Sequence, residues 1–151
     1  MDFNLDAKKK AIIDELGDLG PNCCQKVCMA FKDEFAIDSN ELMVLSAGFG
    51  GGMGYFGMTC GALAGAGMVF SNHFGSDFVN QKEYKKVFYA AVKEMCEAFE
   101  AKSGATTCPA LKKLQAAGLG LSCKELIYLG AAVAEEYIEK YKDQLTNRLA
   151  K

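Results

Sequence analysis

The sequence predicts an all-α fold, a single compact helical domain of about six to seven helices around a central glycine-rich helix. Apolar residues recur at helical spacing along most of the chain, and helix start and stop signals separate the segments. No convincing series of strands is present. With 151 residues, half of them hydrophobic, the chain can form one core. We therefore expect one domain over residues 1–151.

The first two helices are bounded by turn and capping residues. Residues 6–16 carry apolar positions opposite a lysine run, and Gly17 ends this helix. Asn22 is a suitable N-cap for the second helix, because its side chain can accept a hydrogen bond from the first turn. The expected buried face of the second helix contains Cys24, Val27, Cys28, Phe31 and Phe35.

The middle of the chain holds the glycine-rich segment. A third helix is expected after Asp38, because Glu41 suggests a capping box there. The central helix is expected from about Gly57 to Phe70. Residues 42–76 contain no charged side chain, and this uncharged segment is long enough to cross a bilayer. A buried central helix is favoured, because a glycine loop in lipid would need protein or water to satisfy its backbone.

The sequence of the C-terminal half predicts three more helices. A long amphipathic helix spans about residues 80–102 and is closed by Gly104. A short helix starts at Cys108, where Pro109 occupies the first turn, and ends near Gly118. The last helix opens at Ser122, with Glu125 completing a capping box.

Charge and the N-terminal sequence exclude some functional classes. The net charge of −2 and a pI near 5.5, with lysines spread along the helices, argue against a nucleic-acid partner. The N-terminus lacks the basic and apolar regions of a secretory signal, so we expect a cytoplasmic protein without a membrane span. His73, the one histidine, is interpreted as a helix-end residue rather than a ligand.

The seven cysteines divide into two groups. Four of them fall in an expected first helical turn, where free backbone N–H groups and the helix dipole favour thiolates and bound anions. These four are Cys23, Cys60, Cys108 and Cys123. The remaining three, Cys24, Cys28 and Cys96, lie on or beside apolar faces, where a packing role is expected. The first group predicts one shared site.

The same residues resemble the C_GCAxxG_C_C family of redox-active proteins. The resemblance runs through Asn22–Val27, Gly48–Gly54, the Cys60-Gly61-Ala62-x-x-Gly65 core, Ser103-Gly104 with Cys108, and Cys123. It implies that Cys23, Cys60, Cys108 and Cys123 are the family's four cysteines. It also implies redox activity. The family is similar to the non-haem part of split-Soret cytochromes, which looks like a related fold that carries an iron–sulfur centre.

We expect these four cysteines to bind one iron–sulfur cluster, [2Fe–2S] in preference to [4Fe–4S]. The protein would be an electron carrier, rather than a stand-alone enzyme, with a redox partner that the sequence does not identify. The wide spacing of these four cysteines in the sequence argues against a cluster, because the cysteine ligands of ferredoxins come in close groups. A protein without a cofactor that uses thiol–disulfide chemistry, with Cys60 as the attacking thiol, is the alternative. A structural zinc site ranks third.

Gly57, Gly61 and Gly65 are expected to form one small-residue stripe on the central helix, supporting Cys60. The alternative for this stripe is an interface with a partner helix or with a second copy in a homodimer. Tyr55 and Phe56 are expected to pack in the core, with shielding of Cys60 or a docking face as the alternatives.

Overall fold

A computed structural model describes residues 1–149 and confirms the all-α fold. The helices agree with the predicted order, and no strand occurs within residues 1–149. The right-handed α-helices are α1 Ala7–Leu16, α2 Cys23–Ala30, α3 Ser39–Ser46, α5 Gly61–Phe74, α6 Lys82–Ser103, α7 Cys108–Ala116 and α8 Cys123–Tyr141. The segment labelled α4, Gly50–Gly54, has a different, left-handed backbone.

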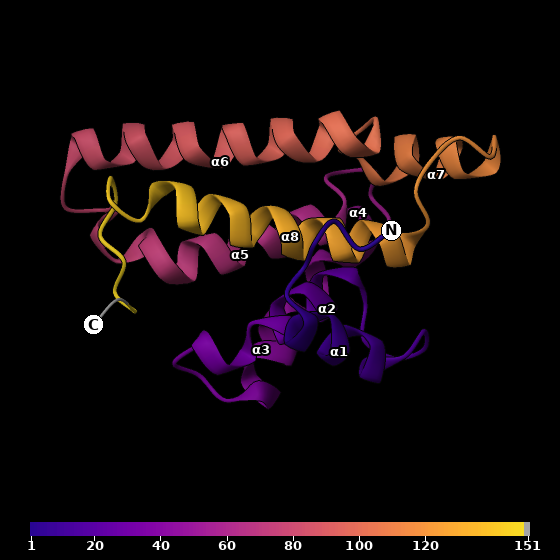
Figure 1. Cartoon of the computed structure of the whole chain (residues 1–151), viewed down its shortest axis with the longest axis horizontal. Helices are drawn as coiled ribbons and strands as arrows, with labels where there is room; N and C mark the ends of the chain where they lie inside the picture. The colour runs from indigo at the N-terminus through magenta and orange to yellow at the C-terminus, as the bar shows by residue number, and fades with distance from the viewer. Residues whose placement is uncertain (150–151) are drawn as a thin grey trace.

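The helices enclose α5 (Figure 1). The long helix α6 runs along one side of the molecule, α8 and α5 lie beneath it, and α1–α3 pack on the opposite side. The main neighbours of α5 are α2 and α8. The charge-free stretch is thus a central helix, as predicted, and its apolar side chains Val69, Phe70 and Phe74 are fully buried.

The glycines of α5 permit close helix packing inside the chain. A Cβ on Gly65 would lie 2.9 Å from Val27 Cβ and 3.1 Å from Cys24 O, both on α2. One on Gly61 would overlap Cys23 Sγ. These two glycines therefore face α2, so they do not form a free interface for a partner helix.

The predicted start of the central helix at Gly57 was wrong. Gly57 has φ +89° and lies outside α5, which begins at Gly61. Thr59 instead pairs with Thr107 in an isolated antiparallel bridge, and this extended backbone excludes residues 57–60 from the helix. The expected three-glycine stripe therefore loses its first member.

Left-handed backbone accounts for the glycines of α4. Five consecutive residues, 51–55, have φ between +63° and +73°. Residues that carry a Cβ disfavour this region, so glycine occupies three of these five positions, and Met53 and Tyr55 occupy the other two. Tyr55 and Phe56, which leave this turn, are 88% and 81% exposed. Their predicted place in the core was therefore wrong.

Hydrophobic side chains form two clusters. The main core lies between α5, α6 and α8 and includes the predicted stripe of α6. A smaller cluster, rich in sulfur, lies between α2 and α3 and one side of α5. Its buried members are Cys24, Cys28, Met29 and Leu42, and Met43 and Met68 pack against it.

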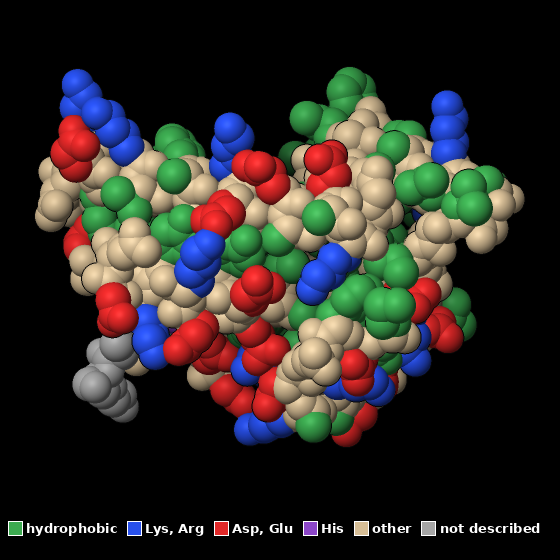
Figure 2. Space-filling model, turned by 45° about the horizontal axis from the view of Figure 1, so that its top comes forward, with side chains coloured by type: hydrophobic (Ala, Val, Ile, Leu, Met, Phe, Trp, Pro, Cys, Tyr) green, Lys and Arg blue, Asp and Glu red, His purple; other side chains and the backbone are tan. Residues whose placement is uncertain are grey.

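The surface combines both signs of charge. Figure 2 shows lysine and arginine side chains interspersed with aspartate and glutamate on the face drawn, together with scattered hydrophobic groups. None of the helices within residues 1–149 combines the length and the hydrophobicity that a membrane span needs.

Candidate functional site

Four helix N-termini meet at one cavity. Cys23, Cys108 and Cys123 are the first residues of α2, α7 and α8, and Cys60 is the N-cap of α5. All four line a single cavity of about 300 Å³, called here the cysteine cavity. Residues up to 100 positions apart in the sequence are thereby brought together, with the positive ends of four helix dipoles around them.

Backbone pairing holds Cys60 beside Cys108. The bridge between Thr59 and Thr107 places the two segments antiparallel. Cys60 N donates to Thr106 O at 2.7 Å, and Cys108 N donates to Met58 O at 3.0 Å. These hydrogen bonds hold Cys60 and Cys108 at neighbouring positions without the help of a bound ligand.

Capping boxes orient the other two cysteines. Asn22 Oδ1 accepts from Gln25 N at 3.0 Å, while Gln25 Oε1 accepts from Asn22 N at 2.8 Å. Ser122 and Glu125 form the same reciprocal pair ahead of Cys123. Each box fixes the first turn of its helix, and with it the cysteine at that position.

Cys60 is the most enclosed of the four. Its side chain is only 6% exposed, and burial raises the pKa of the thiol to about 11. Hydrogen bonds from the backbone N–H groups of Ala62 and Leu63 act in the opposite direction. At neutral pH Cys60 is therefore protonated in the absence of a metal, yet the N-terminus of α5 is arranged to receive its thiolate.

Cys123 lies at the exposed rim of the cysteine cavity. Lys112 Nζ lies 3.2 Å from Cys123 Sγ, and Gln115 Nε2 lies 3.5 Å from it. The hydrogen bond to Cys123 raises the pKa of Lys112. An accessible sulfur beside an ammonium group suits nucleophilic attack better than a buried one does. Cys123 is therefore the more accessible of the two thiols, whereas Cys60, the attacking thiol expected from the sequence, is enclosed.

Sequence reasoning missed two lysines of the cavity wall. Lys26 and Lys112 both line it, and neither forms an ion pair within the described part of the chain. Helical spacing could have found them, because Lys26 follows Cys23 by three residues and Lys112 follows Cys108 by four. They add positive charge to a site whose ligands would be anionic.

Of the remaining predicted residues, Gly61 and Tyr55 also line the cysteine cavity. Cys24, Cys28 and Cys96 do not line the cysteine cavity. A Cβ on Gly61 would overlap Cys23 Sγ, whereas one on Gly57 would lie 3.5 Å from Pro109 Cγ at the start of α7. His73 lies at the C-terminal end of α5, as predicted, with Nε2 at 2.6 Å from Glu34 Oε1.

The spacing of the donors tests which group the cysteine cavity fits. Four sulfurs around one zinc ion would lie about 3.8 Å apart, given Zn–S bonds of about 2.3 Å. Among residues 1–149, no three cysteine, histidine or carboxylate side chains are grouped closely enough to hold one ion. The four thiols around this cavity of about 300 Å³ are therefore not preorganised for a single ion, while their thiolate sulfur is the donor that iron–sulfur clusters take.

Comparison with known proteins gives one match. A family model described as "Putative redox-active protein (C_GCAxxG_C_C)" matches residues 21–142, a range that includes all four cavity cysteines. No curated protein and no solved structure matches this chain.

Proposed function

Because this chain belongs to the C_GCAxxG_C_C family, we propose that it is an electron-transfer protein in which Cys23, Cys60, Cys108 and Cys123 bind one iron–sulfur cluster. The observation that carries this proposal is the convergence of four cysteines, each at a helix N-terminus, on one cavity. When bound, such a cluster would accept and release single electrons.

The residues around the cavity suit a group with negative charge. Helix N-termini offer backbone N–H groups, and the two ammonium groups of Lys26 and Lys112 outnumber the one carboxylate of the wall, Asp18. The N–H groups of Ala62 and Leu63 donate to the Cys60 sulfur. Hydrogen bonds to the sulfurs and nearby positive charge both favour the reduced state, so these groups would raise the potential.

Cys123 and Tyr55 give this site contact with solvent. Cys123 is exposed, and Tyr55, which also lines the cavity, is 88% exposed. Cys60 lies on the enclosed side. A protein partner would therefore approach from the rim formed by α7 and the α4 turn, while the buried side excludes water.

Thiol–disulfide chemistry is the second candidate, and the contact between Lys112 and Cys123 is the observation that favours it. In that reaction the Cys123 thiolate attacks a disulfide of the substrate and releases one of its sulfurs as a thiolate. A second cavity thiol, after losing its proton, then attacks the mixed disulfide. The protein becomes the disulfide, and the substrate is reduced to two thiols.

The test compares Cys60→Ser with Cys96→Ala after anaerobic purification. Iron and acid-labile sulfide in equal amounts, with a visible absorption band bleached by dithionite, are expected in the wild type. Cys60→Ser should lose this band, since one ligand is removed. Cys96→Ala is the control, because Cys96 is half-buried on α6 outside the cavity.

Two iron per chain would identify [2Fe–2S], and four would identify [4Fe–4S]. Equal spectra for Cys60→Ser and Cys96→Ala would contradict the ligand assignment. A wild-type protein that has no iron, but forms a reversible disulfide involving Cys123, would replace the cluster proposal with the thiol–disulfide one.

A further inference from the structure

Three sulfur atoms meet in the smaller hydrophobic cluster, away from the cysteine cavity. Cys24 Sγ lies 3.7 Å from Met68 Sδ, and Cys28 Sγ lies 3.9 Å from the same atom. A hydrogen bond between the two thiols, together with burial, raises the pKa of Cys24. This group, Cys24, Cys28 and Met68, is called here the sulfur triad.

The local structure fixes the positions of these three side chains. Cys24 and Cys28 are four residues apart on α2, so they share one face on successive turns. Met68 follows Gly65 by one turn on α5. Gly65 has no side chain to separate α5 from α2, and this close approach brings the thioether against the two thiols.

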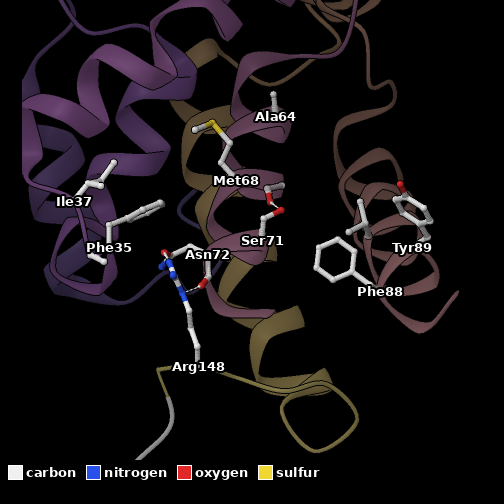
Figure 3. A pocket seen from close by; sticks show the side chains of 12 residues that line it. Phe35, Ile37, Ala64, Met68, Ser71, Asn72, Phe88, Tyr89 and Arg148 are labelled. Atoms are coloured by element: carbon white, nitrogen blue, oxygen red, sulfur yellow. Dashed lines mark hydrogen bonds between the residues drawn. The ribbon is translucent and has the colours of Figure 1, made fainter. Parts of the chain in front are cut away.

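The triad adjoins an open groove. Both cysteine side chains have no exposed surface, whereas Met68 is half-buried and lines a groove of about 620 Å³ between α5, α6 and the segment after α2. Figure 3 shows the Met68 side chain extending from α5 toward the N-terminal helices. An ion in the groove would meet the methionine sulfur first, with the cysteine sulfurs behind it.

Three of the four polar side chains that line this groove form hydrogen bonds, and the fourth, Tyr89, is exposed to solvent. Arg148 Nε donates to Asn72 O at 2.7 Å, and another guanidinium nitrogen donates to Asn72 Oδ1 (Figure 3). Ser71 Oγ donates to Gly67 O at 2.8 Å. Among the three members of the triad, Met68 is the residue that lines this wall and can meet an incoming ion first.

We propose that Cys24, Cys28 and Met68 form a binding site for Cu(I). Soft thiolate and thioether ligands select this ion over Zn²⁺, Mg²⁺ or Ca²⁺. With metal–sulfur bonds of about 2.3 Å, as in zinc–thiolate sites, three sulfurs in a trigonal plane lie about 4 Å apart. The two distances to Met68, 3.7 and 3.9 Å, are close to this spacing.

Binding exchanges protons for the metal ion. Each thiol that becomes a thiolate ligand releases its proton to solvent, so affinity should increase with pH. The copper remains monovalent throughout, and no electron is transferred. The site uses none of the four cysteines of the proposed cluster.

The test measures Cu(I) binding to the full chain anaerobically, by competition with bicinchoninate. Met68→Leu keeps the volume and removes the thioether. We expect it to weaken binding of one Cu(I) by at least about tenfold, since even a residue that only supports a metal ligand contributes that much. Met95→Leu is the matched control, because Met95 is fully buried in the main core. It should bind copper as the wild type does.

Copper in the cysteine cavity is the competing result. X-ray absorption should report three sulfur neighbours in the wild type and two in Met68→Leu. Cys123→Ser should leave the binding unchanged, and Cys28→Ala should abolish it. The proposal is overturned if Met68→Leu and Met95→Leu bind equally well, or if Cys123→Ser loses the copper while Cys28→Ala keeps it.

Discussion

At the scale of single residues, the cavity cysteines differ in their access to solvent and in their charge neighbours. Cys60 is buried and its pKa is raised to about 11, whereas Cys123 is exposed and 3.2 Å from Lys112 Nζ. Cys108 lies between these extremes, with burial raising its pKa and Lys112 acting against that increase. One site therefore contains thiols of unequal reactivity.

The different solvent exposure of the four cavity thiols predicts the order in which they are alkylated in the metal-free protein. Iodoacetamide at pH 7.5 should modify Cys123 first and Cys60 last of the four, as measured by peptide mass spectrometry over time. Lys112→Met should slow modification of Cys123 by roughly two- to fivefold, the factor given by about 0.4–1 kcal/mol of surface attraction. Lys113→Met, on the same helix and exposed, is the control.

An equal rate at Cys123 in both lysine variants would contradict the role given to Lys112. Modification of Cys60 before Cys123 would contradict the burial of Cys60. The second result would also weaken the distinction between an enclosed and an exposed side of the cavity.

At the scale of elements, the left-handed α4 turn supports the start of α7. Gly52 has φ +73°, and a Cβ there would lie 2.8 Å from Cys108 Cβ and 2.9 Å from Met58 O. Met58 O also accepts the hydrogen bond of Cys108 N. The turn, the extended segment and the first residue of α7 therefore form one unit.

We predict that Gly52→Ala destabilises the protein by about 2–4 kcal/mol, combining left-handed strain with overpacking. Gly54→Ala should cost only about 1–2 kcal/mol, because Gly54 has φ +63° but open space around its Cα. Denaturant unfolding of both variants measures the difference. Equal losses would show that the contact with Cys108 is unimportant.

At the scale of the whole molecule, a partly buried ion pair connects distant parts of the chain. Glu34 lies after α2, and its carboxylate contacts His73 at the end of α5 and Lys9 Nζ of α1 at 3.4 Å. Burial opposes ionisation of Glu34, but the hydrogen bond from His73 and the charge of Lys9 outweigh it and lower its pKa. The contact thus stabilises the ionised carboxylate.

This lowered pKa predicts an acid-dependent loss of stability. The contribution of Glu34 is present above its unfolded pKa of about 4.3 and is lost as pH falls through the lower folded value. At pH 7, Glu34→Gln should reduce the free energy of unfolding by about 1 kcal/mol, allowing for solvent screening. At pH 3 the difference from wild type should be much smaller.

Denaturant unfolding at both pH values checks this, with Glu83→Gln as control because that side chain is 80% exposed. A difference at pH 3 as large as that at pH 7 would show that Glu34 acts through packing rather than charge.

The sequence by itself determined the order of the helices and the location of four cysteines at helix N-termini. Local signals were sufficient, because a capping residue, a helical apolar stripe or a terminating glycine acts within a few residues. Asn22, Ser122 and Gly104 were thus assigned correctly. The start of α5 was not, since the pairing of Thr59 with Thr107 spans 48 residues and leaves no local pattern.

Only the tertiary structure decided which side chains share a site. Sequence reasoning gave Cys24 and Cys28 a packing role, and it could not place Met68 beside them, because that contact depends on α5 approaching α2 at Gly65. It also could not place Lys112 beside Cys123, since these side chains belong to different helices. Hydrogen bonds within a helix are local, whereas the packing of one helix on another is set by the shapes of surfaces far apart in the chain.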